Sequence, residues 1–215
     1  MTTKQENHDY LYKSKYFLIQ QRIILIQQKI QKVILVGDAR VGKTSFLIRY
    51  VKGVLPKNQL PTIGVEYLSK SVLLQDGEGI VKAQIWDTSG SEKYKSITAA
   101  HYRKSVGALL FFDLCDYQSF LNSKKWLKEI ENHTEEGIKI MLIGNKLDLI
   151  EENPINRQVN KEEVLEFCQK NNLIYQETSS LTGQNVKESF EFLIQQDIVS
   201  YDQQPVKQNS GCCSC

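Results

Sequence analysis

The stretch that decides the fold is Gly37-Asp38-Ala39-Arg40-Val41-Gly42-Lys43-Thr44, which matches the pattern G-x-x-x-x-G-K-[ST]. The apolar run Val33-Ile34-Leu35-Val36 precedes it with the composition of a buried strand, and Ser45-Phe46-Leu47-Ile48-Arg49-Tyr50 follows with that of a helix. The two glycines allow a tight turn, so that backbone N–H groups point inward and, with the helix N-terminus, bind phosphate oxygens. The stretch therefore predicts a phosphate-binding loop (P-loop) for a nucleoside triphosphate.

Two side chains of the P-loop have predicted roles. We expect Lys43 to contact the outer phosphates and Thr44 to bind a magnesium ion. The alternative, a chance glycine turn between a strand and a helix, is disfavoured because both flanks agree with the motif. The other positions expected to contact the nucleotide are Gly37, Ala39, Arg40, Val41, Gly42 and Ser45.

Composition is that of one compact domain. The chain has 215 residues, of which 41% are hydrophobic and 24% are charged. A net charge of +2, without a long Lys/Arg block, does not favour nucleic acid as a partner. Cys115 and Cys168 lie in apolar segments, whereas Cys212, Cys213 and Cys215 crowd the C-terminus. No disulfide framework is recognisable, which indicates a reducing, cytosolic compartment.

Buried strands alternate with amphipathic helices from residue 33 onward, which is typical of a parallel sheet covered on both faces. The turn signal Asp76-Gly77-Glu78-Gly79 makes the second and third strands an antiparallel hairpin at the sheet edge. The prediction is an α/β fold: a doubly wound, six-stranded, mostly parallel sheet with one antiparallel edge strand and its ligand at the carboxyl ends of the strands. The expected strands are 33–36, 66–75, 80–86, 107–112, 138–143 and 173–177, and the expected helices are 44–53, 118–132, 161–171 and 185–199.

The predicted domain covers residues 31–200, between an extension, 1–30, and a tail, 201–215. Five apolar residues of the extension recur at helical spacing, namely Tyr16, Ile19, Ile23, Ile26 and Ile30. Polar residues interrupt this run, so it is too short and too polar for a membrane span or a secretory signal. Two interpretations stay open: a short helix packed on the domain or on a partner, and a loosely held extension without function.

The loops after the last two strands indicate which base is bound. In Asn145-Lys146-Leu147-Asp148, the Asp148 carboxylate can accept two N–H bonds from the edge of guanine. Adenine offers no matching pair of donors, and a site built this way rejects the wrong base by roughly 10⁴ or more. The later stretch Glu177-Thr178-Ser179-Ser180 can offer a backbone N–H to guanine O6, and Ser179, Ser180 and Leu181 are expected to contact the nucleotide. Guanine is therefore predicted over adenine.

Two further loops, Pro61-Thr62-Ile63-Gly64-Val65-Glu66-Tyr67 and Trp86-Asp87-Thr88-Ser89-Gly90-Ser91-Glu92, complete the pattern. With them the chain resembles the Rab branch of the Ras-like small GTPases, over about residues 31–200 and at the C-terminus. The run 82–114 is most similar to the recycling-endosome Rab subclass. The resemblance implies that Thr62 binds magnesium and senses the γ-phosphate, that Asp87 holds the magnesium shell, and that the Gly90 N–H meets the γ-phosphate.

The resemblance also implies the activity and partners of a membrane-traffic switch. It implies a monomeric GTP hydrolase that binds GTP, GDP and Mg²⁺, with Lys43, Thr62, Gly90 and Ser91 as catalytic residues. Effectors that recognise the ordered switch loops would contact Tyr67, Trp86 and Tyr94. The alternative is that these rings are ordinary core, and for Trp86 both interpretations can hold. The other implied partners are an exchange factor, a GTPase-activating protein, and prenyl-delivery and GDI-type chaperones. The implied location is the cytoplasmic face of an endosomal or vesicle membrane.

Three positions depart from the family pattern. Ser91 stands where most members carry the glutamine that orients the attacking water, which predicts weak unaided hydrolysis. Leu55 stands where an aromatic residue usually covers the guanine edge, and Arg40 replaces a small P-loop residue. Neutral variation is the alternative at all three positions. Two other functions also stay open: a pseudo-GTPase scaffold that binds GTP without turnover and, more distantly, a P-loop ATPase or kinase.

The tail from about residue 202 to 210 is polar and has no periodicity, as in a flexible linker. It ends in Cys213-Ser214-Cys215. A metal site is disfavoured because the chain has no second ligand cluster with zinc spacing, and a C-a-a-X motif from Cys212 lacks aliphatic middle residues. The terminal C-x-C matches the Rab pattern for geranylgeranyl groups on Cys213 and Cys215, and two lipids suit stable anchoring because one lipid binds only marginally.

Overall fold

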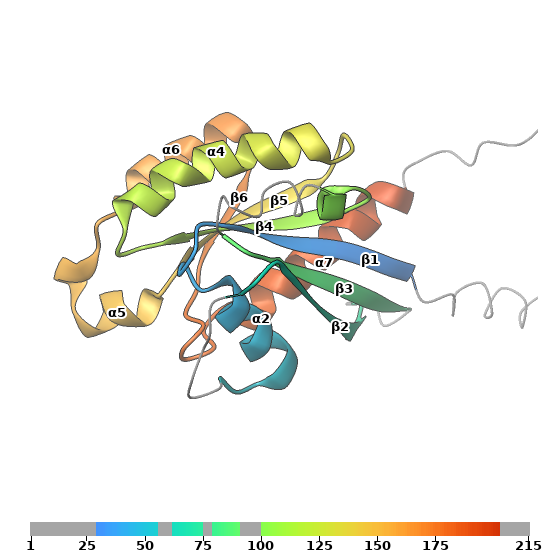
Figure 1. Ribbon diagram of the computed structural model, residues 1–215, viewed down its shortest axis with the longest axis horizontal. Coiled ribbons are helices and arrows are strands. Elements are labelled where there is room, and N and C mark those ends of the chain that lie inside the picture. Colours follow the sequence, from blue (N-terminus) through green and yellow to red (C-terminus); the bar gives the residue numbers. More distant parts are fainter. Residues whose placement is uncertain (1–28, 56–61, 75–78, 91–99, 203–215) are drawn as a thin grey trace, which may run out of the picture.

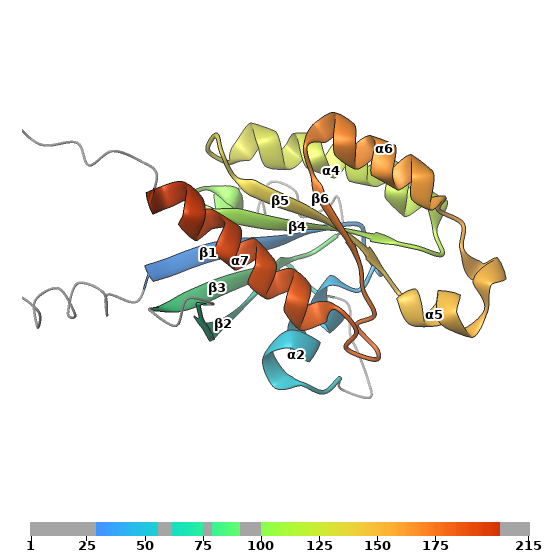
Figure 2. The same cartoon turned by 180° about the vertical axis from the view of Figure 1, so that it is seen from behind.

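The computed structural model describes residues 29–55, 62–74, 79–90 and 100–202 (Figure 1). A six-stranded sheet lies between two layers of helices, with α4 and α6 over one face and α2 and α7 over the other (Figures 1 and 2). The strands are β1 (Lys29–Gly37), β2 (Val65–Leu73), β3 (Ile80–Thr88), β4 (Gly107–Asp113), β5 (Lys139–Asn145) and β6 (Ile174–Glu177). The helices are α2 (Lys43–Lys52), α4 (Tyr117–His133), α5 (Leu147–Glu152), the 3₁₀ helix η2 (Pro154–Asn156), α6 (Lys161–Asn171) and α7 (Val186–Asp202).

The sheet has the strand order β2-β3-β1-β4-β5-β6. Strand β1 pairs in parallel with both β3 and β4, and the parallel ladder continues through β5 to β6. Strand β2 is antiparallel to β3, and a backbone bond from Leu74 N to Gly79 O closes their hairpin. The predicted fold, a mostly parallel six-stranded sheet with one antiparallel edge strand, is confirmed.

Alternation along β1 divides the apolar residues between two cores. Val33 and Leu35 face the core beneath α2 and α7, whereas Ile34 and Val36 face the core beneath α4 and α6. Strand β4 is buried along its whole length, as expected for a central strand covered on both faces. Because β1, β3, β4, β5 and β6 run parallel, their carboxyl ends lie at the same edge of the sheet, which brings the loops that follow them together.

The structure differs from the predicted boundaries at both ends of the domain. Strand β1 begins at Lys29, so Ile30 belongs to a strand and not to a helix in the extension. Its first residues pair with β3, a long-range contact that the local pattern could not show. Helix α7 continues to Asp202, two residues into the predicted tail, and α5 and η2 were not predicted.

Residues 1–28 lie outside the described part. Within the described ranges, no helix is both long and apolar enough to span a bilayer.

Candidate nucleotide-binding site

The P-loop joins β1 to α2 at the carboxyl end of the sheet (Figure 1). Gly37 has φ 141°, and a Cβ on it would lie 2.4 Å from the carbonyl oxygen of Phe111. Gly42 has φ 98°, and a Cβ there would lie 2.2 Å from Nδ2 of Asn145. Both glycines are therefore required by the backbone conformation and by close neighbours. Arg40 also has positive φ and is exposed, so its side chain is directed away from the core.

Lys43 begins α2 and folds back over the loop that precedes it. Its Nζ donates hydrogen bonds to the carbonyl oxygens of Gly37, at 2.8 Å, and Asp38, at 2.7 Å. The side chain is buried, and burial lowers the pKa of Lys43 to about 8, although Asp87 and Asp38 oppose the shift. A buried ammonium inside the P-loop is placed as expected for a group that binds phosphate oxygens.

Three oxygen-bearing side chains meet beside Lys43. The Thr44 hydroxyl donates to Oδ2 of Asp87 at 2.5 Å and lies 2.7 Å from the Thr62 hydroxyl, which is itself 3.4 Å from the same Asp87 oxygen. Burial raises the pKa of Asp87 to about 6, against hydrogen bonds and the charge of Lys43. Its other oxygen, Oδ1, is buried without a hydrogen-bond partner among the described residues.

This cluster fits a magnesium ion. Mg²⁺ prefers hard oxygen ligands, and it is usually held by one or two protein groups together with substrate phosphates and water. The cluster satisfies that requirement, because it supplies two hydroxyls and one carboxylate. One oxygen of the carboxylate is buried and has no hydrogen-bond partner among the described residues. The predicted metal ligands Thr44, Thr62 and Asp87 are thus brought together from α2, the residues before β2, and β3.

Gly90 lies against the P-loop. A Cβ on this residue would come within 2.2 Å of both the backbone nitrogen of Ala39 and the carbonyl carbon of Asp38. The preceding Ser89 donates its N–H to the carbonyl of Gly64, and so ties the residues after β3 to those before β2. The structure therefore places Thr62 and Gly90, from the two predicted switch stretches, beside the phosphate-binding residues.

Asn145 links the loops that surround the predicted base site. Its Nδ2 donates to the carbonyl of Val41 at 2.9 Å. Its Oδ1 accepts from the Thr178 hydroxyl at 3.2 Å, and from the N–H and hydroxyl of Ser180 at 3.2 and 3.1 Å. Because the side chain is buried, one amide holds together the P-loop, the end of β5 and the loop after β6.

The neighbouring residues of the same loop are also held in place. Asp148 accepts a hydrogen bond at 2.5 Å from the Ser179 hydroxyl, which itself accepts from the backbone N–H of Thr182. Lys146 has φ 69°, and its ammonium lies 2.5 Å from a carboxylate oxygen of Asp113 at the end of β4. The predicted base-contacting residues therefore converge at one end of the sheet.

Five residues of the site were not predicted from the sequence. Arg49 of α2 donates through Nε to the carbonyl of Ser180, at 3.0 Å, and through Nη2 to the carbonyl of Leu181. Asp113 pairs with Lys146 as described. Asp38 contacts Asn122 and Trp126 of α4. These contacts join residues far apart in the sequence. Of the five residues, only Asp38 lies inside a recognisable motif, the P-loop, and could have been selected from the sequence.

The other predicted site residues have mixed outcomes. Leu55 follows α2 and is partly buried, and Ser45 lies in the first turn of α2. The Leu181 side chain is 61% exposed, so its contribution to the site is through the backbone. Ser91, Tyr94, Cys213 and Cys215 lie outside the described residues, and the expectations for them stay predictions.

Two of the three predicted effector-contacting rings lie together. Tyr67 and Trp86 pair across β2 and β3 with ring centroids 5.1 Å apart, and Tyr67 is 44% exposed. On Trp86, the ring of His101 stacks at 4.9 Å and the ammonium of Lys32 lies 5.0 Å from the ring centroid. Trp86 is thus half buried within an aromatic and cationic cluster, so both the surface and the core interpretations hold for it.

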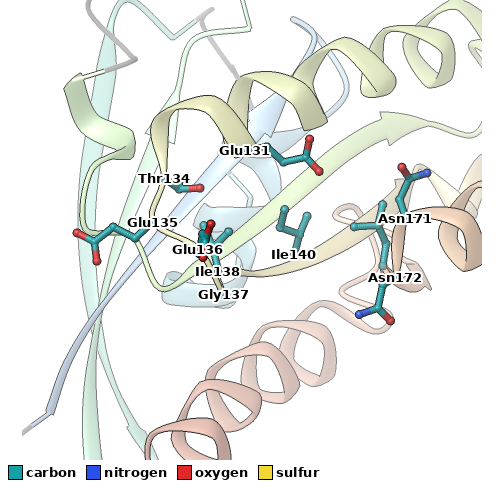
Figure 3. Close-up of a pocket in the computed structure, with 10 residues that line it drawn as sticks. Glu131, Thr134, Glu135, Glu136, Gly137, Ile138, Ile140, Asn171 and Asn172 are labelled. Carbon is teal, nitrogen blue, oxygen red and sulfur yellow. The ribbon is translucent and has the colours of Figure 1, made fainter. Parts of the chain in front are cut away.

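A pocket of about 310 Å³ lies elsewhere, beside the amino-terminal ends of β5 and β6 (Figure 3). Glu131, Glu135 and Glu136 line it together with Asn171 and Asn172, and no predicted nucleotide-binding residue does. Three carboxylates would repel a triphosphate. The candidate nucleotide site is therefore the P-loop end of the sheet and not this pocket.

Comparisons with known proteins agree with this geometry. The family model described as "Ras family" matches residues 32–198. The chain is 42% identical over 179 residues to "Ras-related protein Rab-25" of Homo sapiens, covering 83% of this chain and 80% of that protein. It is 43% identical over 165 residues to "Ras-related protein RABA1g" of Arabidopsis thaliana, covering 77% and 73%.

Proposed function

Since the chain belongs to the Ras family as a small GTPase of the Rab type, we propose that it is a GTP/GDP switch with weak intrinsic hydrolysis on an intracellular membrane. The observation that carries the proposal is the convergence of Lys43, Asn145 and Asp148 at one end of the sheet. Each of these groups matches a different part of a guanine nucleotide. No other described part of the chain combines a phosphate cradle with a carboxylate suited to guanine.

The proposed phosphate contacts use the P-loop. In the structure Lys43 donates to two loop carbonyls, and its ammonium, which has three N–H donors, would also donate to the outer phosphates when nucleotide binds. Thr44, Thr62 and Asp87 would hold Mg²⁺, which neutralises phosphate charge when bound. The raised pKa of Asp87 supports this assignment, because the same burial that disfavours a lone carboxylate favours its pairing with a cation.

The proposed switch depends on Thr62 and Gly90. Both lie on segments that the γ-phosphate would hold, and loss of that phosphate would release them. The hydrogen bond from Ser89 to Gly64 supports a concerted response, since it joins the two segments directly. Effectors that distinguish the two states would contact the surface around Tyr67 and Trp86, together with Tyr94.

The proposed guanine specificity depends on Asp148. Its carboxylate would accept two N–H bonds from guanine, while Ser179 donates to one of its oxygens and fixes its orientation. The backbone N–H groups around Ser180, held by Asn145 and by Arg49, support a contact with guanine O6. A site of this kind rejects adenine by roughly 10⁴ or more.

Weak hydrolysis is inferred from Ser91. A serine hydroxyl is too short to take the place of the glutamine amide that orients the attacking water in the family, and a misplacement of about one ångström can cost on the order of 10²-fold in rate. Unaided hydrolysis in such proteins is already only about 10⁻⁴ per second. An activating protein that supplies an arginine and a glutamine would still allow stimulated hydrolysis. A pseudo-GTPase scaffold is the second candidate, and Ser91 is the feature that favours it.

Membrane association is inferred from Cys213 and Cys215. Two geranylgeranyl groups would anchor the chain, with prenyl-delivery and GDI-type chaperones as partners, at an endosomal or vesicle membrane. If this is right, replacing both cysteines by serine moves the protein to the cytosolic fraction of cells. A double variant that still sediments with membranes would contradict the anchor.

The proposed function is tested by nucleotide competition and single-turnover hydrolysis on the full chain. We expect GTP and GDP to displace a fluorescent GDP analogue in the presence of Mg²⁺, and ATP to fail. We also expect hydrolysis to be hardly detectable in the parent and to rise in Ser91→Gln. Displacement by ATP would overturn the guanine assignment, and equal hydrolysis by the two proteins would show that Ser91 is not the cause of slow turnover.

A further inference from the structure

Asp38 is the second residue of the P-loop, and its carboxylate is held by helix α4. Oδ1 accepts a hydrogen bond from Nε1 of Trp126 at 2.7 Å, and Oδ2 accepts one from Nδ2 of Asn122 at 2.8 Å. Asn122 is itself oriented by Gln118, whose amide donates to its Oδ1 at 3.1 Å. Both carboxylate oxygens of Asp38 are therefore bound by groups that lie one turn apart on the same helix face.

Helix α4 holds these two donors in fixed positions. Asp116 caps its first turn by accepting from the N–H groups of Gln118 and Ser119. The Trp126 side chain is 5% exposed and belongs to the core cluster between α4, α6 and the sheet. Because the helix is fixed by its cap and by its buried face, its hydrogen bonds determine where Asp38 lies.

The backbone of Asp38 faces the reacting end of the site. Its carbonyl oxygen accepts a hydrogen bond from Nζ of Lys43, and its peptide bond to Ala39 is the surface on which Gly90 packs. A single residue thus connects α4 with the phosphate-binding lysine and with the predicted γ-phosphate sensor. A displacement of Asp38 would move both groups.

We propose that Asn122 and Trp126 are positioning residues that hold the P-loop, and through it Gly90, in the arrangement that retains nucleotide. The proposal rests on the proposed function, because it concerns the same site. Neither residue touches the nucleotide; they act through Asp38. Loss of their hydrogen bonds speeds nucleotide release. It also alters the ratio between the release rates of GTP and GDP, because the Gly90 contact matters only when a γ-phosphate is present.

A charge swap between α4 and the P-loop tests the proposal. In Asn122→Asp, a second carboxylate replaces the donor to Asp38, so two like charges face each other. In Asp38→Asn the change is mild, because the Asn122 amide can rotate to accept from the new amide and the exposed Gln118 amide can rotate to accept from Asn122. In the variant that carries both changes, the new amide on the P-loop accepts from Trp126 and donates to the new carboxylate on α4. The interaction is thereby restored with its polarity reversed.

The measurement is the release rate of fluorescent GDP and GTP analogues from the full chain with Mg²⁺. We expect Asn122→Asp to release GDP about tenfold faster, equivalent to about 1.4 kcal/mol, and the double variant to return to within about threefold of the parent. Trp126→Phe keeps an aromatic ring but removes the donor, and we expect it to accelerate release several-fold. The matched control is Asn132→Asp, an identical change at an exposed position of α4.

The outcomes separate this proposal from the proposed function. If the parent binds no guanine nucleotide, the function itself fails. If the parent binds nucleotide but Asn122→Asp and Trp126→Phe release it at the rate of Asn132→Asp, the positioning role is refuted. Faster release in Asn122→Asp without rescue in the double variant also refutes it, since a merely structural defect would not be repaired by the swap. Should Asn122→Asp fail to fold, Trp126→Phe and the folded double variant decide by the same comparison.

Discussion

Replacing Asn145 by alanine should destabilise the domain strongly, because this side chain joins three loops. The substitution leaves the carbonyl of Val41 and the N–H of Ser180 buried without their partner. Each buried, unpaired backbone group costs about 1–3 kcal/mol. We expect a total loss of about 4 kcal/mol in the free energy of unfolding, and a melting temperature lower by roughly 8–16 °C.

The assay is chemical denaturation at a series of GDP concentrations. The contribution of a bound ligand to stability depends on its concentration, whereas the cost of the unpaired groups does not, so the series separates the two. The control is Asn132→Ala, the same change at an exposed position of α4. Thr178→Val, which removes only one hydroxyl from the network, should cost about 1 kcal/mol. If Asn145→Ala were within about 1 kcal/mol of the control, the network would not hold the loops together.

Three other residues give predictions of their own. Lys104 is exposed and has φ 62°. Lys104→Gly should therefore relieve about 0.5–1 kcal/mol of backbone strain and raise the melting temperature, measured by calorimetry, by about 1–4 °C. A lower melting temperature would contradict this. Burial opposes ionisation of Glu177, but hydrogen bonds from Arg157 and Tyr175 outweigh it and hold its pKa below the ordinary 4.5. The contribution of ionised Glu177 to the free energy of unfolding is therefore present above pH 4.5 and is lost as the pH falls through the lower pKa. The stabilities of the parent and of Glu177→Gln, measured by denaturation, should converge below pH 4.5. A difference in stability that does not change with pH would refute this. Leu55→Phe should slow GDP release by up to roughly tenfold, because an aromatic edge-to-face contact contributes about 0.5–1.5 kcal/mol, and an unchanged rate would make Leu55 a neutral variation.

The sequence predicts the fold well because the signals are local. Alternating apolar residues in β1, the continuous apolar run of β4 and the turn between β2 and β3 each specify an element without knowledge of its neighbours. The P-loop and the stretch 145–148 are likewise local motifs, and the structure brings them together because parallel strands end at the same edge of the sheet.

The supporting contacts of the site could not be predicted, because they join distant residues. Asp38 meets Trp126 across 88 positions, and Arg49 meets Ser180 across 131. The partners Trp126 and Arg49 carry no local pattern that indicates these contacts, since a tryptophan at helical spacing is as expected in a core as in a contact with the P-loop. The early start of β1 at Lys29 has the same cause, because those residues are strand only through their pairing with β3.

The central claim, that this site binds guanine through Asp148, is tested most directly by measuring the nucleotide preference of Asp148→Asn. An amide can donate where the carboxylate could only accept, so the variant should prefer xanthine nucleotides, which carry an oxygen in place of the guanine amino group. We predict that xanthosine diphosphate displaces a fluorescent nucleotide from the variant more effectively than GDP does, with the order reversed in the parent. Glu152→Gln, which removes a carboxylate from the exposed end of the same helix, should keep the preference of the parent. Retained preference for GDP in Asp148→Asn would contradict the account.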